Sequence, residues 1–326
     1  MCTSIQLKHG DTYFGRNLDL EYHFGERVVI TPRDYSFTFR KNDAVYKNHL
    51  AMIGMATVVD DYPLYAEAAN EKGVYVAGLY FPGNAWYTDE IKPDKDNITP
   101  FELIPWLLSY SSSLSDVKEL LSRINLVNIP FSEKMPLAGL HWHIADKESS
   151  MVLESTKDGL RIYDDPVGVL TNNPPFDFQL QNLRQYMNLD PHQPSNTFSE
   201  KLDLSTFGVG MGAIGLPGDN SPASRFVKAA FNLNNAVCED GEEGSVSEFF
   251  HILDSVVSVR GSVITPEGKY DITTYSSCIN GDKGIYYYKT YENCRINAVD
   301  MHKEDLDSDR LMVYELDKKL DIKRAN

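Results

Sequence analysis

The chain starts Met1-Cys2-Thr3, and Cys2 is the first residue whose type and position could support covalent catalysis. A small second residue permits removal of the initiator methionine, which would leave a free α-amine on the residue that carries the thiol. Reference pKa values of about 7.7–8.0 for the amine and about 8.5 for the thiol make proton transfer between them nearly balanced. This start predicts an amidase with Cys2 as nucleophile and its own amine as base, although chains also begin Met-Cys without any such role.

A predicted hairpin brings further polar residues to the chain start. The segments Cys2–Leu7 and Thr12–Gly15 have strand-like composition and flank a turn. With the turn centred just before Gly10, antiparallel pairing sets Thr3 opposite Arg16. The residues that follow Arg16 then lie beside the chain start as well.

Arg16 and Asp19 in this hairpin have side chains suited to a cysteine nucleophile. We expect Arg16 to favour the thiolate of Cys2 by its opposite charge. We expect Asp19 to accept a hydrogen bond from the α-amine and to orient it. An exposed ion pair is the competing interpretation for either residue.

Two polar clusters stand out later in the chain. Asn172 directly follows Val169-Leu170, and an amide side chain at a strand exit can donate to a developing oxyanion. A plain turn is the competing interpretation, since Asn173-Pro174 is a turn signal. Arg225 lies in the first turn of a predicted helix, where the helix dipole disfavours a cation. A partner carboxylate, a substrate anion or the active site would explain Arg225 better than helix formation does.

Two further motifs do not predict a ligand. A literal G-x-G-x-x-G begins at Gly210 but runs into the turn at residues 216–219, with no βαβ context. We therefore expect a mobile or tightly turned loop and no dinucleotide. His141 and His143 share one face of a predicted strand without an apparent third ligand, so structural histidines are favoured over a metal site.

Composition limits the class of protein. A formal net charge of −16 argues against a nucleic-acid partner, and an anionic substrate would need a local arginine. No apolar run approaches the roughly 18 residues of a membrane span, so no membrane partner is expected. Cys2, Cys238, Cys278 and Cys294 form neither a disulfide framework nor a zinc motif. These features predict one large α+β domain over residues 1–326, located in the cytoplasm.

Strand-like and helix-like segments occur in blocks along the chain. Strands are expected at 2–7, 12–15, 27–31, 50–58, 73–79, 140–145, 151–154, 168–170, 270–279, 284–291, 295–301 and 311–316. Helices are expected from an N-cap at Thr99 and at 115–124, 178–187, 223–233 and 246–257. This order predicts helices packed on antiparallel sheets rather than alternating βαβ units.

Distinctive stretches follow one another from end to end of the chain: CTSIQL, YFGRNLDLEYHFGERVVITPR, DDYPLYAEAANEKG, NITPFELIPWLL, LHWHIADKESSMVLEST, GVLTNNPPFDFQL, GLPGDNSPASRFV and YSSCINGDKGIYYYKTYENCRINAVDM. In order and spacing this set resembles the choloylglycine hydrolases, the family that contains bile salt hydrolases and penicillin V acylases. The resemblance implies an N-terminal-nucleophile hydrolase, a four-layer αββα sandwich with two antiparallel sheets between helical layers. It also implies a homotetramer, and no metal or organic cofactor.

By motif, the resemblance implies catalytic roles for residues already singled out. Cys2 would be the nucleophile, supported by Arg16 and Asp19 from GRNLD, Asn172 from LTNNP and Arg225 from SPASRF. The oxyanion donors would be the Asn172 side chain and a residue of the GLYFPG segment.

The GLYFPG segment also contains a departure from the family pattern. Bile salt hydrolases typically have Asn where this chain has Tyr80, and penicillin V acylases typically have Tyr there. The rest of the chain looks closest to bile salt hydrolases of Gram-positive gut bacteria. We therefore expect a small amphipathic amide as substrate, cleaved between a steroid acyl group and glycine or taurine. A penicillin V acylase and a catalytically silent binding protein of the same fold are the alternatives.

Apolar residues in the family's substrate loops are expected to bind the acyl group: Leu20, Phe24, Val59, Phe131 and Leu137. Ordinary core packing is the competing explanation for each of them. A hydrophobic pocket with few polar anchors suits a steroid and a phenoxyacetyl group equally well.

Overall fold

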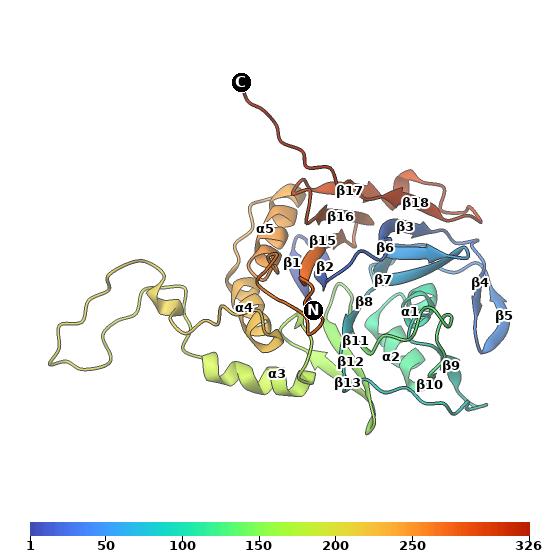
Figure 1. The fold of residues 1–326 in the computed structure, drawn as a ribbon, viewed down its shortest axis with the longest axis horizontal. Coiled ribbons are helices and arrows are strands. Elements are labelled where there is room, and N and C mark those ends of the chain that lie inside the picture. Colours follow the sequence, from blue (N-terminus) through green and yellow to red (C-terminus); the bar gives the residue numbers. More distant parts are fainter.

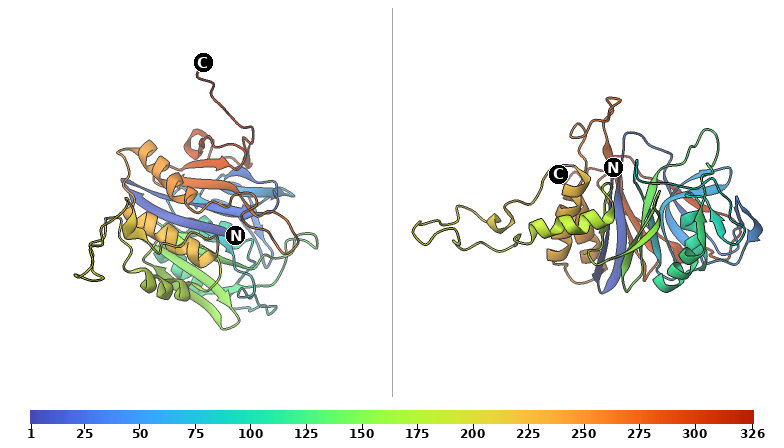
Figure 2. Two further views of the ribbon diagram at one scale, coloured as in Figure 1. Left: turned by 60° about the vertical axis from the view of Figure 1, so that its left-hand side comes forward. Right: turned by 90° about the horizontal axis from the view of Figure 1, so that it is seen from below.

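The computed structural model describes the backbone of residues 1–326 and the side chains of all of them except residues 42–44. Two antiparallel sheets pack face to face, and helices cover the outer face of each (Figures 1 and 2). The expected four-layer αββα sandwich is therefore confirmed. Within the described chain, no helix combines the length and the apolar character needed to cross a bilayer.

The smaller sheet contains the chain start. It has six strands in the order β14-β1-β2-β15-β16-β17. Their bounds are β1 (Cys2–His9), β2 (Asp11–Leu20), β14 (Val169–Leu170), β15 (Ile272–Asn280), β16 (Ile285–Thr290) and β17 (Asn297–Asp300). Since β1 lies between β14 and β2, the first residues are paired on both sides rather than at a free edge.

The larger sheet has eight strands in the order β13-β12-β11-β8-β7-β6-β3-β18. Their bounds are β3 (Arg27–Thr31), β6 (Met52–Val59), β7 (Tyr62–Asn70), β8 (Tyr75–Tyr80), β11 (Leu140–Ala145), β12 (Ser150–Thr156), β13 (Gly159–Asp165) and β18 (Met312–Glu315). Two small sheets pair β4 (Phe37–Phe39) with β5 (Asn42–Tyr46) and β9 (Asp96–Ile98) with β10 (Ile124–Leu126).

Helices cover the outer faces of the two sheets. The larger sheet is covered by α1 (Leu103–Tyr110) and α2 (Leu114–Ser122), and the smaller sheet by α4 (Pro222–Asn235) and α5 (Glu242–Asp254), with α3 (Phe176–Leu183) beside α4. Short 3-10 helices are η1 (Arg184–Tyr186), η2 (Met211–Ala213) and η3 (Met301–Lys303). Apolar side chains therefore meet in one core around the smaller sheet and in a second core beneath α1 and α2.

The β1–β2 register differs by one residue from the sequence-based prediction. The turn is centred on Gly10 itself, at φ +68°, so Ser4 lies opposite Arg16 and Cys2 opposite Leu18. Side chains alternate between the faces of a strand, so a shift of one residue changes which side chains share a face. The observed register puts Arg16 on the same face as Cys2, toward the larger sheet, whereas the predicted one would have separated them.

The glycine-rich run belongs to a long projection. Residues 188–220 leave the body of the molecule and return to α4 (yellow in Figure 1). Gly210 and Gly215 have positive φ, and η2 lies between them, so no phosphate-binding strand–helix unit forms here. Large apolar side chains on this projection are exposed: Phe198, Leu202, Leu204, Phe207, Val209 and Ile214.

Most predicted elements are present, and the errors have identifiable causes. Both β3 and β11 have the predicted bounds, whereas β7 and β13 were not predicted. Strand β7 (YPLYAEAAN) is rich in alanine, which has low β-propensity, and tertiary packing overrides that preference. The predicted N-cap at Thr99 is wrong because Thr99 and Glu102 form a turn, in which Glu102 N–H donates to the Thr99 carbonyl at 3.0 Å, and α1 begins after Glu102.

Gly15 provides a test of the tight packing between β2 and β15. A Cβ atom on Gly15 would lie 2.0 Å from the Ser277 carbonyl oxygen, which is backbone and cannot rotate away. We expect Gly15→Ala to lower the free energy of unfolding by about 1–3 kcal/mol or more, measured by denaturant titration. Gly208→Ala is the control, because a Cβ there meets no atom within 4 Å. Equal stability of the two variants would contradict the packing described here.

Candidate active site

Cys2 begins β1 and is almost completely buried, with 4% of its surface exposed. It lines a pocket of about 470 Å³ whose other walls are mainly apolar. Leu18 and Leu20 of β2 also line this pocket. Its remaining walls include Leu64, Tyr65, Phe101, Ile104, Phe131, Met135 and Leu137. The thiol therefore faces a space that suits a bulky apolar group.

Arg16 is buried on the same face of the hairpin as Cys2 and also lines the pocket. Its Nη1 donates to the carbonyl oxygens of Gly78 at 2.6 Å and of Ala66 at 3.3 Å. Burial opposes the positive charge of Arg16, but the charge of Cys2, followed by that of Tyr275, outweighs this effect and raises the pKa of the guanidinium. Arg16 is thus a permanent cation beside the thiol, which favours the thiolate.

A buried carboxylate supports Arg16 from the larger sheet. Glu67 of β7 lies with Oε2 at 3.8 Å from Arg16 Nη1. Three hydroxyls donate to the Glu67 carboxylate, from Tyr275 at 2.7 Å, Tyr286 at 2.6 Å and Ser277 at 3.1 Å. Burial raises the pKa of Glu67, while Arg16 and these hydroxyls oppose the shift. A buried ion pair with this many hydrogen bonds holds the guanidinium in one position.

Arg225 approaches Cys2 from the other face of the smaller sheet. Its Nη1 donates to the Cys2 carbonyl at 2.5 Å and to Thr3 Oγ1 at 2.6 Å, and its Nη2 donates to Asn172 Oδ1 at 2.7 Å. Burial lowers the pKa of Arg225, and the nearby charges of Asp19 and Cys2 oppose that shift. These bonds explain why a cation lies in the first turns of α4: it binds the backbone of Cys2.

Asn172 connects the chain start to the end of β8. It follows β14, and the register that pairs Ser4 with Leu170 continues to Cys2 and Asn172. Here a side-chain oxygen takes the place of the backbone acceptor, because Cys2 N–H donates to Asn172 Oδ1 at 2.8 Å. Asn172 Nδ2 donates to the Tyr80 carbonyl at 2.7 Å. The amide thus has one N–H bound to protein and a second N–H available for another acceptor.

The structure retains Met1, and its ammonium occupies an acidic corner. Met1 N donates to the Asp19 carbonyl at 2.7 Å and to Asp271 Oδ2 at 3.2 Å. Asp19 Oδ1 accepts from Thr273 Oγ1 at 2.6 Å, while Oδ2 is buried without a hydrogen-bond partner among the described side chains. Burial raises the pKa of Asp271, against the lowering effect of the Met1 ammonium. With Met1 in place, the nitrogen of Cys2 is an amide and cannot act as a base.

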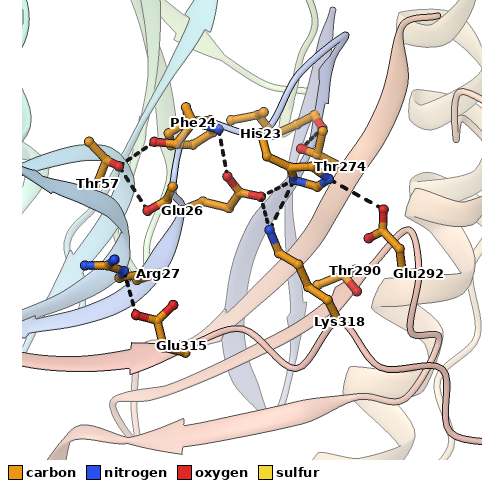
Figure 3. Close-up of polar contacts among 12 residues, drawn as sticks. His23, Phe24, Glu26, Arg27, Thr57, Thr274, Thr290, Glu292, Glu315 and Lys318 are labelled. Atoms are coloured by element: carbon orange, nitrogen blue, oxygen red, sulfur yellow. Dashed lines mark hydrogen bonds and ion pairs between the residues drawn. The ribbon is translucent and has the colours of Figure 1, made fainter.

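The loop between β2 and β3 forms one wall of the pocket. Hydrogen bonds and ion pairs hold this loop in place (Figure 3). Glu26 binds His23 Nδ1 through Oε1, and Lys318 Nζ donates to the same oxygen at 3.0 Å. Phe24 N–H donates to Glu26 Oε2 at 2.9 Å, and the Phe24 carbonyl accepts from Thr57. These contacts hold the Phe24 backbone between Glu26 and Thr57, and its ring packs partly buried against the core around the smaller sheet.

The predicted acyl-binding residues fall into two groups. Leu20, Phe131 and Leu137 line the pocket, whereas Phe24 and Val59 are not among its lining residues. Tyr80 also lines the pocket, at the exposed end of β8, with 49% of its surface exposed. Leu64 and Ile104, which the sequence-based expectation did not include, also line the pocket.

Several polar residues of the site were not expected from the sequence. Glu67 lies on a strand that was not predicted, and its partners come from β15 and β16, far along the chain. Thr3 and Thr273 carry no motif signal that distinguishes them from ordinary strand residues. A carboxylate within an apolar, alanine-rich run was the available signal for Glu67.

These parts together can perform acyl transfer. A thiol beside a fixed cation can ionise, an amide donor can bind a carbonyl oxygen, and an apolar pocket can hold an acyl group. A nucleophile at the start of an inner strand of an αββα sandwich is the arrangement of the N-terminal-nucleophile hydrolases.

Comparison with known proteins identifies the family. The model of the linear amide C–N hydrolases, choloylglycine hydrolase family, matches residues 2–314. A bile salt hydrolase/transferase of Lactiplantibacillus plantarum is 53% identical over 316 residues, which cover 97% of each chain. A bile salt hydrolase/transferase of Clostridium perfringens is 43% identical over the full length of both chains, with 329 aligned residues and 100% coverage. The chain belongs to the choloylglycine hydrolase family and is a hydrolase of linear amide C–N bonds.

Solved structures agree with this assignment. The C2A variant of a conjugated bile acid hydrolase from Clostridium perfringens has a TM-score of 0.93 at 42% identity and covers 100% of both chains. A penicillin V acylase from Agrobacterium tumefaciens has a TM-score of 0.76 at 16% identity, covering 97% of this chain and 91% of that one, which shows a shared fold.

Asn172→Asp tests the role of the amide donor. The substitution keeps the oxygen that accepts from Cys2 and Arg225 but removes the N–H groups, so a developing oxyanion loses its donor. We expect kcat for amide hydrolysis to fall about 100- to 1,000-fold. Asn235→Asp makes the same change at the exposed end of α4, where Nδ2 donates to the Phe231 carbonyl, and should keep the wild-type rate. A wild-type rate in Asn172→Asp would exclude the amide as a donor.

Proposed function

We propose that the chain hydrolyses the amide bond of glycine- or taurine-conjugated bile salts through a thioester on Cys2. The observation that supports this most directly is the position of Cys2, which lies between Arg16 and the Asn172 amide and lines a largely apolar pocket of about 470 Å³. Full-length relatives named bile salt hydrolase/transferase, at up to 53% identity, support the same substrate class.

Maturation is the first step of the proposed mechanism. Removal of Met1 converts the backbone nitrogen of Cys2 into a free α-amine, which keeps Asn172 Oδ1 as its acceptor. It also removes the ammonium that occupies the corner between Asp19 and Asp271. We propose that Asp19, whose Oδ2 lacks a partner among the described side chains, then orients the new amine.

Acylation follows from the site geometry. The Cys2 thiolate attacks the amide carbonyl carbon, so a C–S bond forms and the carbonyl oxygen becomes an oxyanion. The free N–H of Asn172 and a group of the Tyr80 segment, its backbone N–H or its side chain, hold that oxygen. The α-ammonium of Cys2 protonates the leaving nitrogen, the C–N bond breaks, and glycine or taurine departs.

Deacylation uses the same groups. The α-amine takes a proton from water, the resulting hydroxide attacks the thioester carbonyl, and a C–O bond forms. The C–S bond then breaks, which releases the bile acid and restores the thiolate. Arg16 stays cationic throughout and stabilises the thiolate at the start and end of the cycle.

Penicillin V hydrolysis is the second candidate, favoured by Tyr80. The half-exposed Tyr80 ring lines the pocket. There it would narrow the space for the acyl group and stack on the phenyl ring of the substrate. A silent binding protein is the third candidate, and retention of Met1 in the mature chain would favour it.

Assembly and location are also part of the proposal. Self-association would bury the exposed Phe207 and Val209 of the 188–220 projection. We propose that four copies of the chain, each folded as one domain, form a homotetramer. All four cysteines are free, as expected in the reducing cytoplasm, which we propose as the location.

Product release from glycocholate, taurocholate and penicillin V, measured side by side, tests the function. We expect turnover of the two bile salts that is lost in Cys2→Ala, because alanine removes the nucleophile. N-terminal mass mapping of the active preparation should find Cys2 as the first residue. Penicillin V turnover without bile-salt turnover would favour the acylase instead, and activity that survives in Cys2→Ala would contradict the mechanism.

Tyr80→Asn tests the contribution of the ring to substrate choice. We expect the ratio of kcat/KM for glycocholate over penicillin V to rise about 2- to 12-fold, since loss of a stacked aromatic contact costs about 0.5–1.5 kcal/mol. Tyr22 also lines the pocket with an exposed ring, so Tyr22→Asn is the matched control. An unchanged ratio in Tyr80→Asn would exclude Tyr80 as the determinant.

A further inference from the structure

His141 lies behind the site, on the second residue of β11, and is completely buried at 0% exposure. The mechanism described above does not use it. Two of the residues that it contacts, Phe81 and Thr171, belong to the two segments that flank the proposed oxyanion site. One segment is Tyr80–Pro82 at the end of β8, and the other is Thr171–Asn173 after β14.

The imidazole touches both segments at once. Its ring stacks on Phe81 with centroids 4.2 Å apart and an angle of 5° between planes. Its Nε2 lies 3.0 Å from the Thr171 carbonyl oxygen. Phe81 follows Tyr80 in sequence and Thr171 precedes Asn172, so each contact is one residue away from a proposed oxyanion-binding group.

Two other hydrogen bonds join the two segments. Asn172 Nδ2 donates to the Tyr80 carbonyl at 2.7 Å, and Asn173 Nδ2 donates to the Pro82 carbonyl at 2.8 Å. These are amide contacts near solvent, and one of them belongs to the group that must also bind the oxyanion. The contact through His141 is buried and independent of that group.

Hydrogen bonds on both ring nitrogens fix the orientation of this imidazole. Nε2 faces a backbone carbonyl, and Nδ1 faces Glu154 Oε1 at 3.2 Å. A backbone carbonyl can only accept, so Nε2 carries a proton and donates to Thr171. The same Glu154 oxygen accepts from Phe176 N–H at 3.0 Å, which fixes the carboxylate at the start of α3. The His141 ring is therefore held between the Thr171 carbonyl and a Glu154 side chain that is itself immobilised.

We propose that His141, held by Glu154, is a positioning residue that sets the separation of the two oxyanion-binding segments. The inference rests on the proposed function, in which the Asn172 amide and the Tyr80 segment bind the oxyanion. Loss of His141 would let the segments move apart by a fraction of an ångström. Displacement of a donor weakens binding of the oxyanion more than binding of the planar amide, because the donor is directed at the charge that develops in the transition state.

His143 is a matched control on the same strand. It lies two residues further along β11, on the same face, and is also completely buried. Its Nδ1 shares a hydrogen bond of 2.8 Å with Ser4 Oγ, its Nε2 lies 3.2 Å from Asp165 Oδ2, and its ring lies 4.9 Å from that of Phe14. These contacts involve β1, β2 and β13, not the two segments.

The experiment compares His141→Gln and His143→Gln with wild type on whichever of glycocholate, taurocholate and penicillin V the wild type cleaves fastest. We expect kcat to fall about 10- to 100-fold in His141→Gln with KM nearly unchanged, and to stay near wild type in His143→Gln. Unfolding temperatures of both variants show whether the two losses of packing are comparable.

A second readout separates positioning from stability. An aldehyde analogue of the acyl group forms a hemithioacetal with Cys2 and places an oxygen in the oxyanion site, whereas the corresponding alcohol does not. His141→Gln should lower the affinity for the aldehyde by the same factor as it lowers kcat. The affinity for the alcohol should stay unchanged. Phe81→Leu, which removes the stacking face and leaves the His141–Glu154 contact in place, should act in the same direction if His141→Gln does not fold.

Two outcomes would overturn the inference, and they are distinguishable. Wild-type kcat and aldehyde affinity in His141→Gln, or equal losses in His141→Gln and His143→Gln, would exclude the positioning role and leave the proposed function intact. Absence of turnover of all three substrates by wild type itself would contradict the proposed function, and the inference with it.

Discussion

Two guanidinium groups are buried against Cys2 from opposite faces of the sheet that it enters. A buried charge is tolerated only where hydrogen bonds and opposite charges replace water, so each arginine constrains its surroundings. Arg16 requires Glu67 and backbone carbonyls of the larger sheet. Arg225 requires the Cys2 carbonyl and Asn172 from the helical side of the smaller sheet. Because these partners come from three layers, the site forms only when the layers have packed together.

This arrangement reverses the local electrostatics of a strongly acidic protein. The chain has a net charge of −16, yet two buried cations, Arg16 and Arg225, interact electrostatically with Cys2. Fixed charges in a partly desolvated site act more strongly than the distant surface charges, which salt screens. Negative charge is therefore stabilised locally at this place, although the whole molecule repels anions.

The sequence alone was sufficient to single out Cys2, Arg16, Asn172 and Arg225, because each is a polar residue in a position that local structure does not explain. Glu67 could not be found in the same way. Its place depends on hydroxyls of β15 and β16, from residues more than 200 positions away in sequence, with separations of 208, 210 and 219. Sequence periodicity carries no information about such contacts, and the alanine-rich strand that contains Glu67 has weak β-propensity.

The sequence by itself determined the family, the order of most strands and helices, and the residue types available for chemistry, since these depend on motifs and on local periodicity. Tertiary structure decided which of these residues meet. The turn centred on Gly10 shifted the hairpin register by one residue and thereby put Arg16 on the face of Cys2. Packing of the two sheets then brought the ends of β8 and β14 to the chain start and turned Phe24 toward the core instead of the pocket. A side chain's face and its distant neighbours follow from register and packing, which are properties of the assembled sandwich and not of any one segment.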